Sequence, residues 1–369
     1  MKTIVSIIGI RPDFIRMASI FKLLDTNFNH ILIHTGQHYD ELLSNVFFKD
    51  LNIRKPDFTL KTGIPGISRE HWEQLSYLSS AIIELFRKEK INPNLILFLG
   101  DSNSSCCALP LKKESYKIGH IEAGMRSGDR RMLEEINRIV CDHCSDLFFV
   151  YHENYKQKLE SENIHDNIYV VGNTIVEVCL PFLKEFSNEE KIFDTVLIDI
   201  HRPENFKYPE RLSNIIEYIR FISNKFPEIK FKMLDFPGTM SKLTQEMIIN
   251  LNELKVDIIP LMGYKDYLEK LYNCRFIISD SGTAQEEPAL FNVPVIVPRD
   301  FTERPESVDY GCSFMIDVNT INNSSWNKSI TYINNVENNI QLIDSTWLGT
   351  GHTAEYVING IKEFLKEEK

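Results

Sequence analysis

Carboxylates follow several short apolar runs in the first half of the chain. Asp101 and Glu122 each come just after such a run, and the pair Glu134-Glu135 stands one helical turn before Arg138. Acidic residues in a first helical turn are often only partners of the helix dipole. Several carboxylates that share a site with arginines, however, can have pKa values suited to moving protons. The pattern therefore favours proton-transfer chemistry at these positions.

Two further segments carry residue types that bind phosphate. In Gly9-Ile10-Arg11-Pro12-Asp13-Phe14-Ile15-Arg16, glycine permits a tight turn, proline suits a first helical turn, and the two arginines flank a helix N-terminus. Asp280-Ser281-Gly282-Thr283 also passes from a predicted strand into a helix with small residues and hydroxyls, and Arg304 adds a cation. Each arginine taken alone is as readily a solvated surface charge. Together, the two turns suggest a diphosphate ligand bound across a cleft between two lobes.

The remaining reactive residue types give weaker signals. His201 follows an apolar run in the second half of the chain, although a lone histidine is usually structural. Cys141-Asp142-His143-Cys144 has the look of a metal motif, but no second cysteine pair follows at finger-like spacing, so we predict no metal site. Neither a Gly-x-Gly-x-x-Gly fingerprint nor a Walker loop is present, and we expect no cofactor.

The elements that must position these residues alternate between short apolar runs and amphipathic stretches. This β-α alternation predicts an α/β fold with doubly wound parallel sheets, which bind ligands at the carboxyl ends of their strands. The predicted strands are 3–8, 30–34, 95–99, 116–120, 147–150 and 168–171, and then 195–200, 229–233, 257–260, 275–279 and 294–297. The predicted helices are 12–24, 72–88, 132–144 and 154–163, and then 209–224, 240–251, 264–272 and 284–291.

Chain length and net charge limit the number of domains and the class of partner. A chain of 369 residues favours two domains, and Pro181–Lys191, where proline and a mixed-charge run interrupt the apolar pattern, is the predicted hinge. We expect surface helices in the asparagine-rich stretch 319–345. A net charge of −11, from 41 basic and 52 acidic residues, argues against nucleic acid or an anionic membrane as the partner. No apolar run is long enough to span a bilayer and no signal peptide is visible, so we expect a cytoplasmic protein with reduced cysteines.

Taken in order, the motifs resemble those of the UDP-N-acetylglucosamine 2-epimerase family over residues 3 to 360. They are Gly9-Ile10-Arg11-Pro12-Asp13, Thr35-Gly36-Gln37-His38-Tyr39-Asp40, Gly100-Asp101-Ser102-Asn103-Ser104, His120-Ile121-Glu122-Ala123-Gly124, Glu134-Glu135-Ile136-Asn137-Arg138, Val171-Gly172-Asn173-Thr174, His201-Arg202-Pro203-Glu204-Asn205, Asp280-Ser281-Gly282 with Gln285-Glu286-Glu287, Thr302-Glu303-Arg304-Pro305-Glu306 and Gly349-Thr350-Gly351.

This resemblance implies a glycosyltransferase-B-like fold with the active site in the interdomain cleft. The domains would be residues 1–180, with the C-terminal helix 352–369 packing back on them, and 181–351 as the UDP-binding domain. Non-hydrolysing members invert C2 of a UDP-2-acetamido sugar without NAD, by eliminating UDP to leave a 2-acetamidoglucal and then adding UDP back. The resemblance also implies a homodimer and a place in surface-polysaccharide sugar biosynthesis.

The resemblance also implies roles for individual residues. Asp101, Glu122 and Glu134 would transfer protons and Arg138 would orient them, with the order of the proton transfers left open. His201 and Arg11 would hold the diphosphate. The other expected contacts to the UDP-sugar are those of Arg16, Ser281, Gly282, Thr283, Glu287 with the ribose hydroxyls, and Arg304.

Several positions depart from the family pattern. Arg16 replaces a customary lysine, and Thr283 replaces the second glycine of the Ser-Gly-Gly turn. Phe236-Pro237-Gly238-Thr239 stands where members with an allosteric UDP-N-acetylglucosamine pocket carry His-Pro, and Asp40 stands where they carry glutamine. We therefore expect no such regulation, and a substrate closer to the 6-deoxy or otherwise modified UDP-2-acetamido sugars.

Three alternatives remain open. A hydrolysing epimerase would release the free sugar and UDP. A sensor without catalysis would have no need of Asp101, Glu122, Glu134 and His201 together. A transferase would share the fold and would release UDP only when an acceptor is present.

Overall fold

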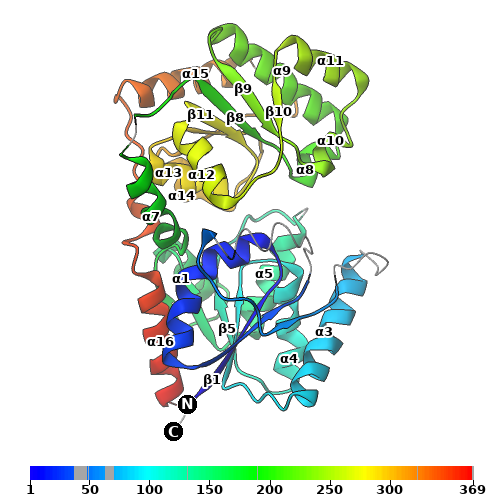
Figure 1. Ribbon diagram of the computed structural model, residues 1–369, viewed down its shortest axis with the longest axis vertical. Coiled ribbons are helices and arrows are strands. Elements are labelled where there is room, and N and C mark those ends of the chain that lie inside the picture. The colour runs from blue at the N-terminus through cyan, green and yellow to red at the C-terminus, as the bar shows by residue number, and fades with distance from the viewer. Residues whose placement is uncertain are drawn as a thin grey trace. The chain divides into compact units, whose positions relative to one another are not determined.

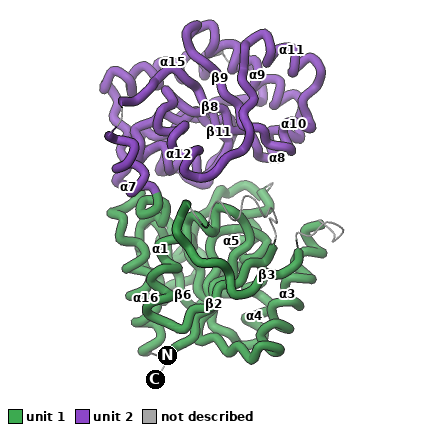
Figure 2. Tube along the Cα trace, in the orientation of Figure 1, with its two compact units in different colours: residues 1–178, 348–369 green, residues 179–347 purple. Residues whose placement is uncertain are grey.

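The computed structural model describes residues 1–36, 48, 50–62, 70–130, 132–188, 190–321 and 323–367. The chain divides into two compact units, which Figure 2 colours separately. Unit 1 comprises residues 1–178 and 348–369, and unit 2 comprises residues 179–347. None of the helices in the described ranges is long and apolar enough to cross a membrane.

The sheet of unit 1 is parallel throughout, in the order β3-β2-β1-β4-β5-β6-β7. Its inner strands are continuous apolar runs because parallel strands are covered on both faces. The order reverses between β1 and β4, the place where such sheets bind ligands. The strands are β1 Thr3–Ile8, β2 Asn29–His34, β3 Phe58–Thr59, β4 Leu95–Leu99, β5 Ile118–Ile121, β6 Leu147–Val150 and β7 Ile168–Val170.

Helices cover both faces of this sheet, with α1 and α16 on one side and α3 and α4 on the other (Figure 1). α16 is the chain's return to unit 1, where Lys362 Nζ donates to Asn27 Oδ1 at 2.6 Å and the Ala354 amide donates to Glu177 Oε1 at 2.9 Å. The helices are α1 Arg11–Asn27, α3 His71–Lys88, η1 Asn103–Cys107, α4 Ala108–Lys113, α5 Leu133–Cys144, α6 Glu153–Ser161 and α16 Thr353–Glu367. Helix α7, Ile175–Phe186, begins in unit 1 and ends in unit 2.

Unit 2 repeats the plan with a parallel sheet in the order β10-β9-β8-β11-β12-β13. Its order reverses between β8 and β11. The strands are β8 Thr195–Asp199, β9 Lys230–Leu234, β10 Asp257–Ile259, β11 Phe276–Ser279, β12 Val295–Val297 and β13 Ser313–Met315. Apolar side chains of α9, α11 and α15 bury one face of this sheet. The helices are α8 Pro203–Phe206, α9 Pro209–Lys225, α10 Pro237–Met240, α11 Gln245–Glu253, α12 Tyr264–Asn273, η2 Thr283–Gln285, α13 Glu287–Phe291, α14 Pro305–Asp309, α15 Asn323–Glu337 and η3 Thr346–Leu348.

The predicted α/β class with two parallel sheets is confirmed. Pro181 lies inside α7, so the prediction that this proline interrupts the apolar pattern was wrong, while the hinge at 181–191 stays a prediction. Strands β3 and β13 were not predicted, and the helix predicted at 240–251 begins only at Gln245, as α11. The stretch 319–345 contains the expected helix as α15, which buries Trp326 and Ile333 in the core of unit 2.

Candidate functional site

The structure brings two of the predicted proton-transfer residues, Asp101 and Glu122, to one edge of the sheet of unit 1. Strand β4 pairs with β1 on one side and with β5 on the other, with Leu99 opposite Ile121. Asp101 and Glu122 therefore leave adjacent strands at their carboxyl ends, as the sequence predicts. The segment that begins α1 leaves the neighbouring strand β1 at the same edge.

Glu122 is held in an uncommon backbone conformation. Its φ is +71°, a region that side chains with a Cβ rarely adopt, and its amide donates to Phe149 O at 3.0 Å. Gly124, two residues on, has φ +77°, and a Cβ there would lie 2.3 Å from Tyr155 O. The turn after β5 therefore requires glycine at 124 and fixes where the Glu122 carboxylate points.

A buried arginine pairs with that carboxylate. Arg16 Nη1 lies 3.2 Å from Glu122 Oε2, and the two side chains are 3% and 5% exposed. The same nitrogen donates to Asn173 Oδ1 at 3.4 Å, and the guanidinium lies over the ring of Tyr151. Arg16 was predicted to flank a phosphate site, and in this structure its guanidinium is directed to Glu122.

Asp101 has a corresponding partner in Arg138, which α5 presents. The Arg138 guanidinium forms an ion pair with Asp101 Oδ2, and its own side chain is 1% exposed. The two glutamates at the start of α5 differ in role. Glu135 is buried and accepts from the Ser127 and Gly128 amides at 2.8 and 3.0 Å, whereas Glu134 is half-buried. Glu135 thus shapes its own loop, which leaves Glu134 as the candidate for chemistry.

Asp13 belongs to a predicted motif, but sequence reasoning gave it no role. Its Oδ2 accepts from the Gly9 and Ile10 amides at 2.8 and 3.1 Å. Burial raises the pKa of Asp13 to about 7, and the nearby carboxylates of Asp101 and Glu122 add to the rise. These two amides therefore already donate to a carboxylate of the chain itself, that of Asp13. A phosphate at this turn would depend on Arg11 instead.

A buried network that the sequence did not reveal ties the turn after β4 to the turn after β5. His120 Nδ1 lies 2.6 Å from Asp142 Oδ1, and its Nε2 lies 2.9 Å from Gly100 O. Asp142 Oδ2 accepts from the Gly124 amide at 3.1 Å and pairs with Arg126 at 2.8 Å. Because Asp142 is held in this way, the Cys-Asp-His-Cys stretch is part of a hydrogen-bonded framework.

The protonation of this network follows from its contacts. Burial by itself would lower the pKa of His120, but its contacts with Cys141 and Asp142 outweigh burial and raise that pKa well above 6.5. Burial opposes ionisation of Asp142 too, but His120 and Arg126 lower its pKa below 3.8. A doubly protonated His120 can donate both to Asp142 and to the Gly100 carbonyl, which a neutral ring cannot do.

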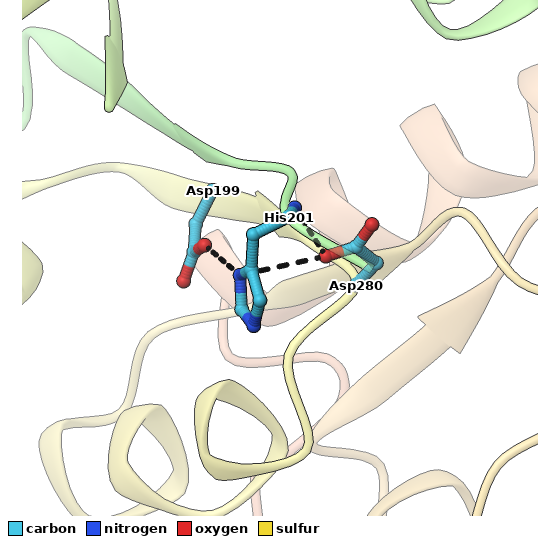
Figure 3. A group of neighbouring side chains, drawn as sticks. All are labelled: Asp199, His201 and Asp280. Atoms are coloured by element: carbon cyan, nitrogen blue, oxygen red, sulfur yellow. Dashed lines mark hydrogen bonds and ion pairs between the residues drawn. The ribbon is translucent and has the colours of Figure 1, made fainter. Parts of the chain in front are cut away.

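In unit 2, His201 lies at the reversal point of the sheet, just beyond β8 (Figure 3). Its Nδ1 lies 2.8 Å from Asp199 Oδ1, and its amide donates to Asp280 Oδ1 at 2.9 Å. The ring of Phe236 packs against the imidazole with the centroids 4.7 Å apart. The segment that lacks the family's His-Pro pair thus contacts His201 directly.

The turn after β11 contains the other predicted ligand contacts. Ser281 Oγ and Thr283 Oγ1 lie 3.0 Å apart. A Cβ on Gly282 would lie 2.6 Å from Arg304 Nη1, so a side chain at this position would displace the Arg304 guanidinium. Arg304 was predicted to bind sugar or phosphate. It is 3% exposed and pairs with Glu286 at 2.6 Å and with Glu303 at 2.9 Å, which makes it a support of the turn.

Glu287 begins α13 and is buried. Its Oε1 accepts from the hydroxyl of Tyr264 at 2.7 Å. Asp40, the other position on which the regulatory prediction depends, lies outside the described residues.

Comparison with known proteins gives consistent matches. Residues 22–362 match the family model described as UDP-N-acetylglucosamine 2-epimerase. The chain is 37% identical to the UDP-N-acetylglucosamine 2-epimerase of Methanococcus maripaludis over 324 residues, which cover 84% of this chain and 86% of that protein. It is 32% identical to the UDP-2,3-diacetamido-2,3-dideoxy-D-glucuronate 2-epimerase of Pseudomonas aeruginosa over 323 residues, or 85% and 88% of the two chains.

Among solved structures, the fold resembles the crystal structure of Methanocaldococcus jannaschii UDP-GlcNAc 2-epimerase in complex with UDP-GlcNAc and UDP. The TM-score is 0.86, the sequence identity is 33%, and the match covers 98% of this chain and 99% of that chain.

Proposed function

Because the chain belongs to the UDP-N-acetylglucosamine 2-epimerase family, we propose that it inverts the configuration at C2 of a UDP-2-acetamido sugar. The observation that carries this proposal is the pair of carboxylates at adjacent strand ends, Asp101 with Arg138 and Glu122 with the buried Arg16. Two positioned carboxylates suit a reaction that takes a proton from one face of a ring and returns one to the other.

The chemistry explains why the diphosphate must take part. The C2 hydrogen of such a sugar is not next to a carbonyl, so its removal has to be coupled to departure of a stabilised leaving group. A carboxylate takes the C2 proton, the C–H electron pair forms the C1=C2 bond, and the C1–O bond to UDP breaks. Re-addition of UDP at C1, with a proton delivered to the opposite face of C2, completes the inversion. Asp101, Glu122 and Glu134 are the proposed proton-transfer residues, and Arg138 orients Asp101.

Unit 2 supplies the proposed contacts to UDP. His201, together with Arg11 of unit 1, would hold the diphosphate, and the Ser281-Gly282-Thr283 turn would bind phosphate oxygens through hydroxyls and amides. Glu287, whose carboxylate is already positioned by Tyr264, would accept from ribose hydroxyls. The homodimer, the cytoplasmic location and the surface-polysaccharide pathway stay predictions.

Product analysis tests this proposal against its alternatives. The full chain is incubated, without added cofactor, with UDP-N-acetylglucosamine, its 6-deoxy analogue and a UDP-2,3-diacetamido-glucuronate, and the products are followed by proton and phosphorus NMR. We expect at least one sugar to give its C2 epimer still linked to UDP. Free sugar with an equal amount of UDP would indicate the hydrolysing alternative. No conversion of any substrate would overturn the proposal.

A further inference from the structure

We propose that Asp199 is a positioning residue for His201: it binds Nδ1 of the ring and thereby presents the Nε2–H as a donor to an oxygen of the leaving diphosphate. This inference rests on the proposed function, in which His201 contacts the diphosphate. It adds a residue, Asp199, that lies outside the motifs on which that function depends.

The geometry places the Asp199 carboxylate against one specific nitrogen. Asp199 is the last residue of β8, is 4% exposed, and has Oδ1 at 2.8 Å from His201 Nδ1. Residues two apart on an extended segment share a face, which is why these two side chains meet. Figure 3 shows Nε2 on the side of the ring away from both carboxylates. The His201 side chain keeps 30% exposure, so this edge is reachable from outside.

Unlike Asp199, Asp280 binds the backbone, because its carboxylate oxygens accept from backbone amides. Oδ1 accepts from the His201 amide at 2.9 Å, and Oδ2 accepts from the Arg202 amide at 3.1 Å and from Asn205 Nδ2 at 3.0 Å. Asp280 is fully buried and fixes where the turn after β8 runs. Asp199 then sets the orientation of the ring within that turn, with Phe236 packed against it.

The charges around His201 favour the protonated ring. Burial alone would lower the pKa of His201, but Asp199 by charge and hydrogen bond, together with the charge of Asp280, raises it above 6.5. Arg202, at the start of α8, acts in the opposite direction, and its own guanidinium lies 3.6 Å from Glu303. A protonated imidazole can donate from both nitrogens at once, to Asp199 and outward.

The same three side chains also lie close enough to hold a metal ion, with one ligand atom from each within 4.8 Å of the others. The hydrogen bonds argue for a different use. Nδ1 is engaged by Asp199, and both oxygens of Asp280 accept N–H groups. A cation here would have to displace these contacts. We therefore interpret the group in Figure 3 as a histidine whose ring is oriented by a carboxylate.

The test compares wild type, Asp199→Asn and a matched control, Asp194→Asn. Asp194 lies just before β8 and pairs with Lys230 at 2.5 Å on the surface, so its substitution leaves His201 untouched. The pKa of His201 is measured in the substrate-free full chain by NMR of labelled histidine, assigned with His201→Gln. We expect wild type and the control to titrate above pH 6.5 and Asp199→Asn to titrate lower by about one to three pH units.

Affinity for UDP supplies a second readout. The ratio of the Kd of Asp199→Asn to that of wild type should be near one at a pH below the measured His201 pKa of both proteins, where both rings are protonated. Between the two pKa values, where only the wild-type ring is protonated, the ratio should rise to about tenfold, the effect of losing one hydrogen bond to a charged group. Ionisation of UDP itself cancels in the ratio. An unchanged His201 pKa, or a ratio that does not vary with pH, would overturn the proposal.

The experiment can also give two other results, and each has its own meaning. If Asp199→Asn fails to fold, the wild-type nitrogen shifts still decide the matter, because a His201 ring that titrates at or below pH 6.5 contradicts the inference. If UDP binding and titration behave as expected but no UDP-sugar is epimerised, the proposed function fails while the role of Asp199 stands.

Discussion

Glu122 has a strained backbone conformation, and its carboxylate forms a buried ion pair. The strained φ places the carboxylate where that ion pair can form. A left-handed φ on a residue with a Cβ costs about 1 kcal/mol or more, and Glu122 adopts +71°. That conformation directs the carboxylate toward Arg16, which Asn173 and Tyr151 hold in place. A residue kept in a costly conformation at the end of a buried strand is expected where the position of a side chain matters more than stability.

We predict that Glu122→Gln removes turnover while UDP binding stays near normal. Glutamine has nearly the same shape and can still face Arg16, but it cannot exchange a proton, so kcat should fall by about 10² to 10⁴. Turnover is followed by NMR and UDP affinity by calorimetry. If UDP binding disappears together with turnover, Glu122 is a structural residue and the proton-transfer assignment fails.

Sequence reasoning at this scale found the residues whose position follows from a strand end. Asp101, Glu122 and His201 lie where a parallel sheet gathers ligand contacts, so knowing the strands was enough. Strand positions alone could not separate Glu134 from Glu135, which only the family resemblance did, because the difference lies in which carboxylate the Ser127–Gly128 turn binds. The ion pairs of Arg304 with Glu286 and Glu303 could not be predicted either, because tertiary packing brings these side chains together, and its contact with the ligand stays a prediction.

At the scale of elements, the His120–Asp142–Arg126 network joins β5 and α5 to the turn after β4. His120 reaches Gly100 O from β5, and Asp142 reaches the Gly124 amide from α5. Asp101 directly follows Gly100 and Glu122 lies two residues before Gly124, so the network sets the spacing of the two carboxylates. His120 and Asp142 are fully buried, and the periodicity of the sequence does not predict their contact.

We predict that Asp142→Asn destabilises the protein by about 3 to 5 kcal/mol, because it leaves the buried charge of His120 without its counterion and Arg126 with Glu162 alone. Glu162→Gln is the matched control. Glu162 is the other partner of Arg126 and its side chain is 20% exposed, so its loss should cost at most about 1 kcal/mol. Urea unfolding measures both variants. Equal losses for the two variants would show that the network is not the anchor described.

The network also predicts a pH dependence of stability. His120 has a folded-state pKa raised well above the 6.5 of an unfolded chain. Its contribution is therefore complete below pH 6.5 and is lost as the pH rises through the folded-state value. The difference in unfolding free energy between wild type and His120→Gln should shrink between pH 6.5 and pH 9. A difference that stays constant over this range would contradict a protonated His120.

For the whole molecule, the alternation of strands and helices was enough to predict two parallel sheets. The course of the chain between the units was harder to predict. Pro181 was read as a break, but α7 continues through it because the flanking residues from Ile175 to Phe186 are apolar on most positions. The last helix, α16, returns to α1 through side-chain contacts such as Lys362 to Asn27, 335 residues apart in the chain, which local patterns do not encode.

Exchange at C2 in D2O tests the central claim most directly. The full chain is incubated in D2O with the UDP-sugar that it converts, and the C2 position of substrate and product is read by NMR and mass spectrometry. Breaking the C2–H bond predicts that the product carries one deuterium at C2 and keeps its UDP, and that Glu122→Gln incorporates none. A product with its original C2 hydrogen would contradict epimerisation through proton removal at C2.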